Sequence, residues 1–143
     1  MKITKENAEI INTPKVYMHD DLFVGMHFDY ENQLISLSLK RYLPQCSKWQ
    51  DYYVYFEQVC GYFMTSSHFW GQGNSVLDFF YPSMEEQILF PRLRAKVLEA
   101  DAYDFLKITS KLERCMEVAI VLNSGDELIV VCETVNVQHV ISK

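Results

Sequence analysis

The side chains best suited to metal chemistry are histidines and acids near the start of the chain. The triplet His19-Asp20-Asp21 is followed by His27 and Asp29. Imidazole and carboxylate groups can together hold a divalent cation, but such a site needs three or four ligands that converge from different elements. Only His27 and Asp29 can be brought together, because they share one face of a predicted strand. We therefore predict no metal site and retain Asp20, His27 and Asp29 as binding candidates.

A serine and a histidine are adjacent in the stretch 65–73, at Ser67 and His68. A catalytic triad needs such groups to converge on a strained turn, and the sequence contains no Gly-x-Ser-x-Gly motif. We therefore predict no catalytic residue and no enzymatic activity. We interpret His68, Phe69 and Trp70 as part of a recognition loop, since exposed aromatic side chains on loops mark binding surfaces. The alternative is a loop whose rings close one end of the core.

Two aromatic-rich segments flank this loop and must position it. More than half of the chain's aromatic residues lie between positions 49 and 81. Aromatic side chains favour strands and bury large areas. The sequence therefore predicts central strands at 52–65 and 76–81, with a bulge near Glu57-Gln58. The stretch 41–51 contains Pro44 and has no clear period, so we predict a loop there.

Alternating apolar residues predict two antiparallel hairpins. One covers 22–40, with its turn at 31–33. The other covers 115–137, with its turn at 123–126, where Asn, Ser, Gly and Asp follow one another. The return strand of the second hairpin is apolar on both faces, which indicates a central position in a sheet. A further short strand is expected at 15–19.

A capping box at Ser83 and Glu86 predicts a helix at about 84–100, broken near residue 90 by Pro91. Together these elements predict a mainly β chain that borders on α+β. The expected architecture is an antiparallel two-sheet sandwich or a partly open barrel of six to eight strands with one helix.

Length and charge limit the remaining possibilities. A chain of 143 residues suits a single domain, 1–143, in which 1–14 forms a tail or a leading strand that is loosely held. The formal net charge is −6, which disfavours binding to nucleic acid. The amino terminus lacks a long apolar run, so we expect neither export nor a membrane span, and a cytoplasmic location follows.

The four cysteines are expected to be reduced thiols in that compartment. Cys46, Cys60, Cys115 and Cys132 contain no Cys-x-x-Cys pair, so the spacing of a zinc cluster is missing. The sequence also lacks a glycine-rich loop that would cradle a phosphate. We therefore expect no cofactor.

Short motifs spread over most of the chain resemble a loose group of small bacterial β-rich domains of unknown function. The resemblance implies no activity and no site residues. The chain is also similar in size and acidity to the immunity proteins of toxin systems. The matching motifs are His19-Asp20, Phe28-Asp29-Tyr30-Glu31-Asn32, Val59, Phe69-Trp70-Gly71, Asp78-Phe79, Ser124-Gly125-Asp126, Leu128 and Cys132-Glu133.

Two functions fit these observations. The first is a non-enzymatic domain that binds a protein, with a toxin as its sharpest version, through the 65–73 loop and the neighbouring hairpin ends. The alternative is a small-ligand pocket or an enzyme in a barrel mouth around His68 and Trp70. An edge strand such as 33–40 could also pair two copies into a homodimer.

Overall fold

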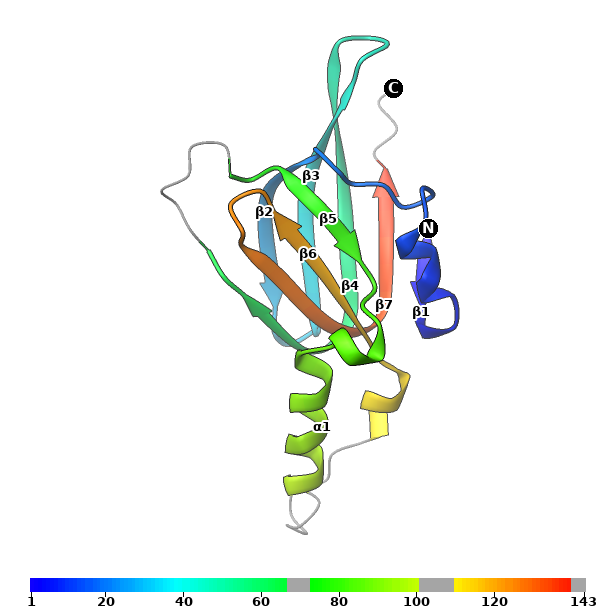
Figure 1. The fold of residues 1–143 in the computed structure, drawn as a ribbon, viewed down its shortest axis with the longest axis vertical. Helices are drawn as coiled ribbons and strands as arrows, with labels where there is room; N and C mark the ends of the chain where they lie inside the picture. Colours follow the sequence, from blue (N-terminus) through cyan, green and yellow to red (C-terminus); the bar gives the residue numbers. More distant parts are fainter. Residues whose placement is uncertain (67–72, 101–109, 140–143) are drawn as a thin grey trace.

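The computed structural model describes residues 1–66, 73–100 and 110–139. Its seven strands form one antiparallel sheet in the order β2-β3-β4-β7-β6-β5, and β1 pairs with β7 (Figure 1). The prediction of a mainly β fold is therefore confirmed. The strands are β1 (Lys2–Thr4), β2 (Leu22–Asp29), β3 (Leu34–Leu43), β4 (Lys48–Met64), β5 (Val76–Phe80), β6 (Met116–Leu122) and β7 (Glu127–His139).

The sheet curls back on itself but does not close into a barrel. Its two edge strands meet only near their ends, where Leu22 and Ser75 form an isolated bridge. The backbone of Val76 also exchanges hydrogen bonds with the backbone of Asp20 and Asp21. Of the two predicted architectures, the structure is therefore the partly open barrel.

Alternation along the strands places one set of apolar side chains inside this barrel. Met26, Leu37, Val54 and Val137 form one row across four neighbouring strands, and the last three are buried. Successive side chains along a strand point to opposite faces, so the same strands present polar residues on the outside of the barrel. The predicted hairpins at 22–40 and 115–137 are confirmed, as is the central position of β7.

Strand β4 bends sharply in its middle. Gln58 has a φ of 53°, and the register with β7 shifts between Val59 and Gly61. The predicted bulge is thus present and extends a few residues beyond Glu57. It divides β4 into two halves that face different surroundings.

The predicted helix is present in two parts. A short 3-10 helix, η2 (Met84–Glu86), precedes the α-helix α1 (Leu89–Ala100). The break therefore lies at residues 87–88, and Pro91 lies in the first turn of α1, where it costs no intrahelical hydrogen bond. Two further 3-10 helices are η1 (Lys5–Asn12) and η3 (Ser110–Arg114).

Three sequence predictions differ from the structure. Residues 15–19 form turns and irregular backbone instead of a strand, beginning just after Pro14. Residues 41–51 extend β3 and β4 into a long hairpin around a turn at 44–47. The segment 33–40 is not an edge, because β3 lies between β2 and β4.

The amino-terminal segment resolves the two alternatives given for residues 1–14. Its strand β1 pairs with β7 over Lys2–Thr4, and Ile3 is fully buried. Ala8 and Ile11 of η1 also enter the core. The segment is therefore a leading strand packed into the fold.

Candidate functional site

The outward-facing side of β3, β4 and the end of β7 forms an open surface. Register pairs place its side chains in two neighbouring rows, and none of them is buried. We call this surface the outer tyrosine face, and it consists of Ser36, Ser38, Tyr53, Tyr55, Asn136 and Gln138.

Two stacked tyrosines form the centre of the outer tyrosine face. The ring centroids of Tyr53 and Tyr55 are 6.2 Å apart, and the ring planes differ by 25°. Short serine side chains lie beside the rings on β3, and amides lie beside them on β7. The result is an aromatic platform with hydrogen-bonding groups on both sides.

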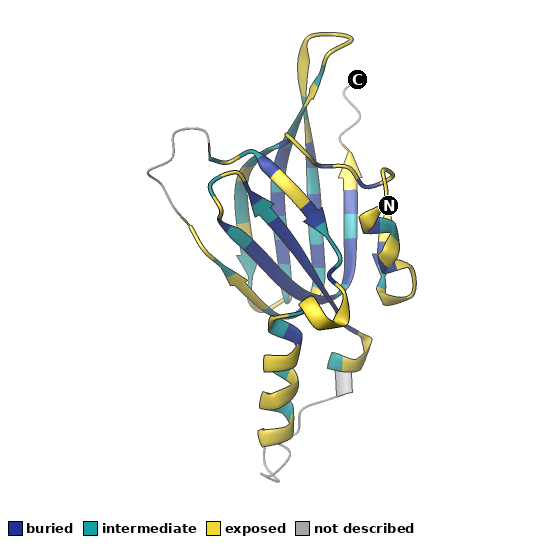
Figure 2. Cartoon of the chain, in the orientation of Figure 1, coloured by how far each residue is buried: buried dark blue, intermediate teal, exposed yellow. Residues whose placement is uncertain are grey.

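The β3–β4 hairpin projects beyond this face as a two-stranded ribbon (Figure 1). β3 pairs with β2 only as far as Lys40, and β4 pairs with β7 only as far as Tyr52. Beyond these points the two strands pair only with each other among the described residues. Figure 2 shows the projecting part as mostly exposed. We call residues 41–50 the aromatic ribbon.

Two large rings occupy one face of the aromatic ribbon. Tyr42 and Trp49 are cross-strand partners with ring centroids 5.3 Å apart. Tyr42 is 45% exposed and Trp49 is 50% exposed. They lie on the same side of the sheet as Tyr53, because these three residues occupy alternate positions in the β3–β4 register. The ribbon therefore continues the outer tyrosine face.

A buried ion pair fixes the base of the aromatic ribbon. Asp21 is only 4% exposed, and its Oδ2 lies 2.9 Å from Nη2 and 3.1 Å from Nε of Arg41. Arg41 also donates to the carbonyl oxygen of Tyr17. The hydroxyl of Tyr52 donates to the same Asp21 oxygen at 2.5 Å. This network ties the ribbon to the segment that precedes β2.

Burial and these contacts shift the acid–base behaviour of the network. Burial first, and then the hydrogen bond to Asp21, raises the pKa of Tyr52 well above its ordinary value. The ring of His139 lies 5.3 Å from the ring of Tyr52. Burial, followed by the positive charge of Arg41, lowers the pKa of His139. Tyr52 therefore keeps its proton and donates a hydrogen bond to Asp21.

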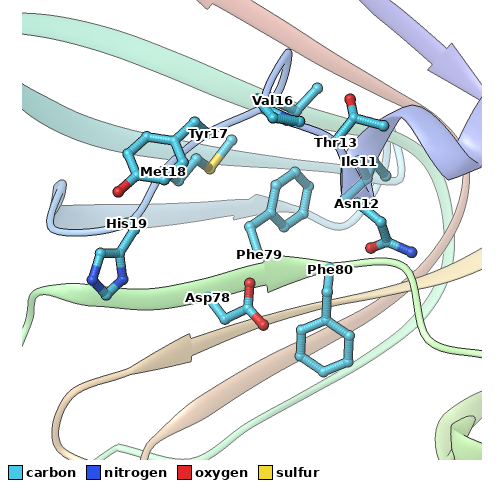
Figure 3. A pocket seen from close by; sticks show the side chains of 11 residues that line it. Ile11, Asn12, Thr13, Val16, Tyr17, Met18, His19, Asp78, Phe79 and Phe80 are labelled. Atoms are coloured by element: carbon cyan, nitrogen blue, oxygen red, sulfur yellow. The ribbon is translucent and has the colours of Figure 1, made fainter.

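A separate hollow lies between the segment 11–19 and β5 (Figure 3). Its volume is about 380 Å³. Phe79 points toward Ile11 and Met18, whereas Asp78 and Phe80 point to the other side of β5 (Figure 3). Asp78 is exposed.

His19 lies at one end of this hollow with a fixed orientation. Its Nδ1 lies 2.7 Å from the carbonyl oxygen of Leu77, so Nδ1 carries a hydrogen and donates it to that oxygen. Nε2 is 3.6 Å from a carboxylate oxygen of Asp20. Both side chains are exposed to solvent.

The structure describes three of the six predicted binding residues. His68, Phe69 and Trp70 lie outside the described residues. Asp20 precedes β2, whereas Asp29 lies at the other end of that strand.

His27 and Asp29 do share the outward face of β2, as predicted from their spacing. Asp29 accepts hydrogen bonds from the side chain of Asn32 at 2.7 Å and from its backbone at 3.2 Å. These bonds lower the pKa of Asp29 and fix the β2–β3 turn. In the described part of the chain, histidine, cysteine and acid side chains form no group of three that could hold a metal.

The tyrosines of the outer tyrosine face lie in the aromatic-rich segment 49–81, but sequence reasoning did not assign them to a surface. Tyr53 and Tyr55 alternate with Tyr52, Val54 and Phe56. Such alternation separates an exposed tyrosine row from a buried row, and that signal was available. The pairing of Tyr42 with Trp49 was hidden by the prediction of a loop at 41–51.

Among the described residues, none of the helices has the length and apolar character that crossing a membrane requires. Comparison with protein-family models, with curated proteins and with solved structures found no match to this chain. The family therefore stays open, and the geometry of the surface is the basis for inferring a function.

Proposed function

We propose that this chain is a non-enzymatic domain that binds a folded protein partner through the outer tyrosine face and the aromatic ribbon. The observation that carries this proposal is the exposed Tyr42–Trp49 pair, held on a projecting hairpin whose base is fixed by Asp21 and Arg41. Trp and Tyr dominate the energetics of protein interfaces. Exposed rings add little to the stability of a lone two-stranded ribbon, so their presence there favours a role in binding a partner.

The composition of the surface supports a protein partner. Tyrosine, serine and amide side chains also dominate the binding loops of antibodies, because tyrosine offers a large contact area with few rotatable bonds. Cross-strand pairing already restrains Tyr53 and Tyr55, so binding would cost little further side-chain entropy.

The charges on this surface are mixed. Lys40 and Asp51 are cross-strand partners whose charged atoms are 4.0 Å apart, between the tyrosine platform and the ribbon. The whole chain has a net charge of −6, which would attract a basic partner over a longer range. A basic toxin is one partner that has this chemistry.

Affinity capture with matched variants tests the proposal. The wild-type chain, Trp49→Ala and Tyr30→Ala are each immobilised and exposed to lysate of the native host, and bound proteins are quantified by mass spectrometry. Tyr30 is 81% exposed near the opposite end of β3, so its variant controls for the loss of an exposed ring. We expect a protein that binds wild type and Tyr30→Ala equally and Trp49→Ala at least tenfold less. Equal recovery on all three would contradict the proposed surface.

A second candidate function is the binding of a small apolar ligand, and one groove favours it. The groove lies at the end of β2 and the bend of β4, has a volume of about 640 Å³, and is lined partly by Phe28, Tyr30 and Tyr62. The rings of Phe28 and Tyr62 are 4.8 Å apart. This volume lies within the range of small-molecule sites. A thermal-shift screen of apolar metabolites against wild type and Tyr62→Ala tests this second function. A ligand of the groove should raise the melting temperature of wild type and not that of Tyr62→Ala.

A further inference from the structure

Two cysteine thiols from distant parts of the chain lie in contact on the covered side of the sheet. Cys60 belongs to the bulge of β4, and Cys115 directly precedes β6. Their Sγ atoms are 3.1 Å apart, although the residues are 55 positions apart in sequence. None of the four cysteines, all within the described residues, forms a disulfide.

Helix α1 packs over these two thiols and fixes their surroundings. Phe90, Leu93 and Leu112 pack in one apolar cluster with Cys60 and Cys115. A methyl group added at Gly61 would meet Leu93 at 2.9 Å, so the helix lies close against the backbone beside Cys60. The two sulfur atoms are therefore held together by the packing of three separate segments.

The two thiols differ in their access to solvent. Cys115 is buried, whereas Cys60 is half-buried and lines the open groove beside Tyr62. A small oxidant in that groove would therefore meet Cys60 before Cys115. The other thiols offer no comparable pair, because Cys46 is exposed on a turn and Cys132 belongs to the core on the inner face.

We propose that Cys60 and Cys115 form a reversible disulfide when the protein meets a peroxide, which makes this pair a site of oxidative modification. A disulfide bond is about 2.0 Å long, so the two sulfur atoms need to approach by roughly 1 Å through side-chain rotation. The bond would join the bulge of β4 to the start of β6 beneath α1.

The reaction balances with hydrogen peroxide as the oxidant. The thiolate of Cys60 attacks one peroxide oxygen, the O–O bond breaks, and hydroxide leaves, which gives a sulfenic acid at Cys60. The sulfur of Cys115 then attacks the sulfur of Cys60, the S–O bond breaks, and water leaves after the thiol proton is transferred to it. Two thiols and one peroxide yield one disulfide and two waters, and a thiol reductant reverses the change.

The order of the two steps follows from the environments of the sulfur atoms. The hydrogen bond with Cys60, and then burial, raises the pKa of Cys115. Cys115 therefore remains a thiol and is shielded, so Cys60 reacts with the oxidant first. Cys115 is then the resolving residue, already at contact distance.

The disulfide would close a chain loop that contains β5 and α1. A cross-link over a loop of 55 residues removes conformational freedom from the unfolded chain and is expected to raise the folding equilibrium constant about a thousandfold. The oxidised protein should therefore unfold at a higher urea concentration than the reduced protein.

Mass spectrometry and urea unfolding test this proposal on the full chain. Reduced wild type, Cys60→Ser and Cys46→Ser are treated with hydrogen peroxide, denatured, alkylated and digested with trypsin and a Glu-specific protease. Cleavage after Glu117 and Glu127 separates Cys115 from Cys132. We expect wild type and Cys46→Ser to lose two hydrogens and to give a Cys60–Cys115 cross-linked peptide. Their urea midpoint should rise on oxidation and return to the value of the reduced protein when a thiol reductant is added. Cys60→Ser should give neither change.

Two results would overturn the proposal. One is sulfinic acid at Cys60 with Cys115 still alkylated, because the resolving step would then have failed. The other is a cross-linked peptide whose formation leaves the urea midpoint unchanged or lowers it, because the native fold would then oppose the bond.

Discussion

The outer surface of β4 and β7 has two halves: helix α1 covers one, and the other is open. On one side of the β4 bend, Gly61 and Val131 lie beneath α1, and Val131 is completely buried. On the other side, Tyr53 and Gln138 form a register pair that no described element covers. One pair of strands thus supplies both a second small core and an open surface.

The difference between the two halves lies in side-chain type. The covered half has glycine, cysteine and valine, which let a helix approach closely. The open half has tyrosines, serines and amides, which satisfy their polar groups in water and still offer apolar area. The open half is therefore suited to reversible contact with a partner, whereas the covered half is suited to permanent packing.

The most damaging change should be one that removes the cover. The buried carboxylate of Glu117 accepts hydrogen bonds from the backbone N–H groups of Ile88, Leu89 and Phe90 at 2.9, 2.7 and 2.7 Å. Glu117→Ala would leave these donors at the start of α1 without their acceptor. We expect a loss of about 3–4 kcal/mol in the free energy of unfolding, measured with urea. Glu117→Gln keeps one acceptor oxygen and should lose about half as much.

Loss of the ion pair beneath the aromatic ribbon should have the next largest effect. Asp21→Asn leaves Arg41 partly buried without its counterion and weakens the bond from Tyr52. We expect a loss of about 2–3 kcal/mol in the free energy of unfolding. Asp20→Asn changes a neighbouring exposed carboxylate and should stay within about 0.5 kcal/mol of wild type. Similar losses in both variants would show that the network does not anchor the ribbon.

A matched pair of substitutions measures the two halves directly. Val131→Ala opens a cavity under α1 and should cost about 2 kcal/mol in the free energy of unfolding. Tyr53→Ser removes a larger side chain from the open half and should cost less than about 1 kcal/mol, because the ring is only partly buried. Equal costs would indicate that the open half is part of the packed structure and is not reserved for a partner.

The smallest effect concerns pH. The pKa of His139 is lowered from its ordinary value of 6.5, so the unfolded chain binds a proton more readily than the folded chain. Stability should therefore fall as the pH falls from about 6.5 toward the lowered value in the folded state. Urea midpoints between pH 7.5 and 5 should decline more steeply for wild type than for His139→Gln. Parallel curves would mean that another group controls stability in this range.

The sequence was most informative where local patterns and the fold agree. Alternation over 22–40 and the Asn-Ser-Gly-Asp turn at 123–126 predicted hairpins that the structure contains. The capping-box pattern at Ser83 marked the start of the helical region, although Ser83 and Glu86 bond to each other through their side chains. Local rules suffice in these places because neighbouring residues carry the interactions.

Long-range partners explain what the sequence could not reveal. Glu117 lies in an apolar strand, and its role depends on backbone donors about thirty residues earlier in the chain. Arg41 and Asp21 are joined only once β3 lies beside the segment before β2. The ribbon at 41–50 lacks a clear period because, among the described residues, its two strands pair only with each other. Its rings therefore pair in a region that periodicity marks as irregular.

The few backbone contacts that join residues 20–23 to residues 74–76 affect how the barrel can deform. Away from Leu22 and Ser75 the two edge strands β2 and β5 share no ladder, so their separation can change while all other strand pairs keep their register. The gap between β2 and β5 can thus widen. The side chains inside the barrel can then adjust to a change in the volume of the core with little loss of hydrogen bonding.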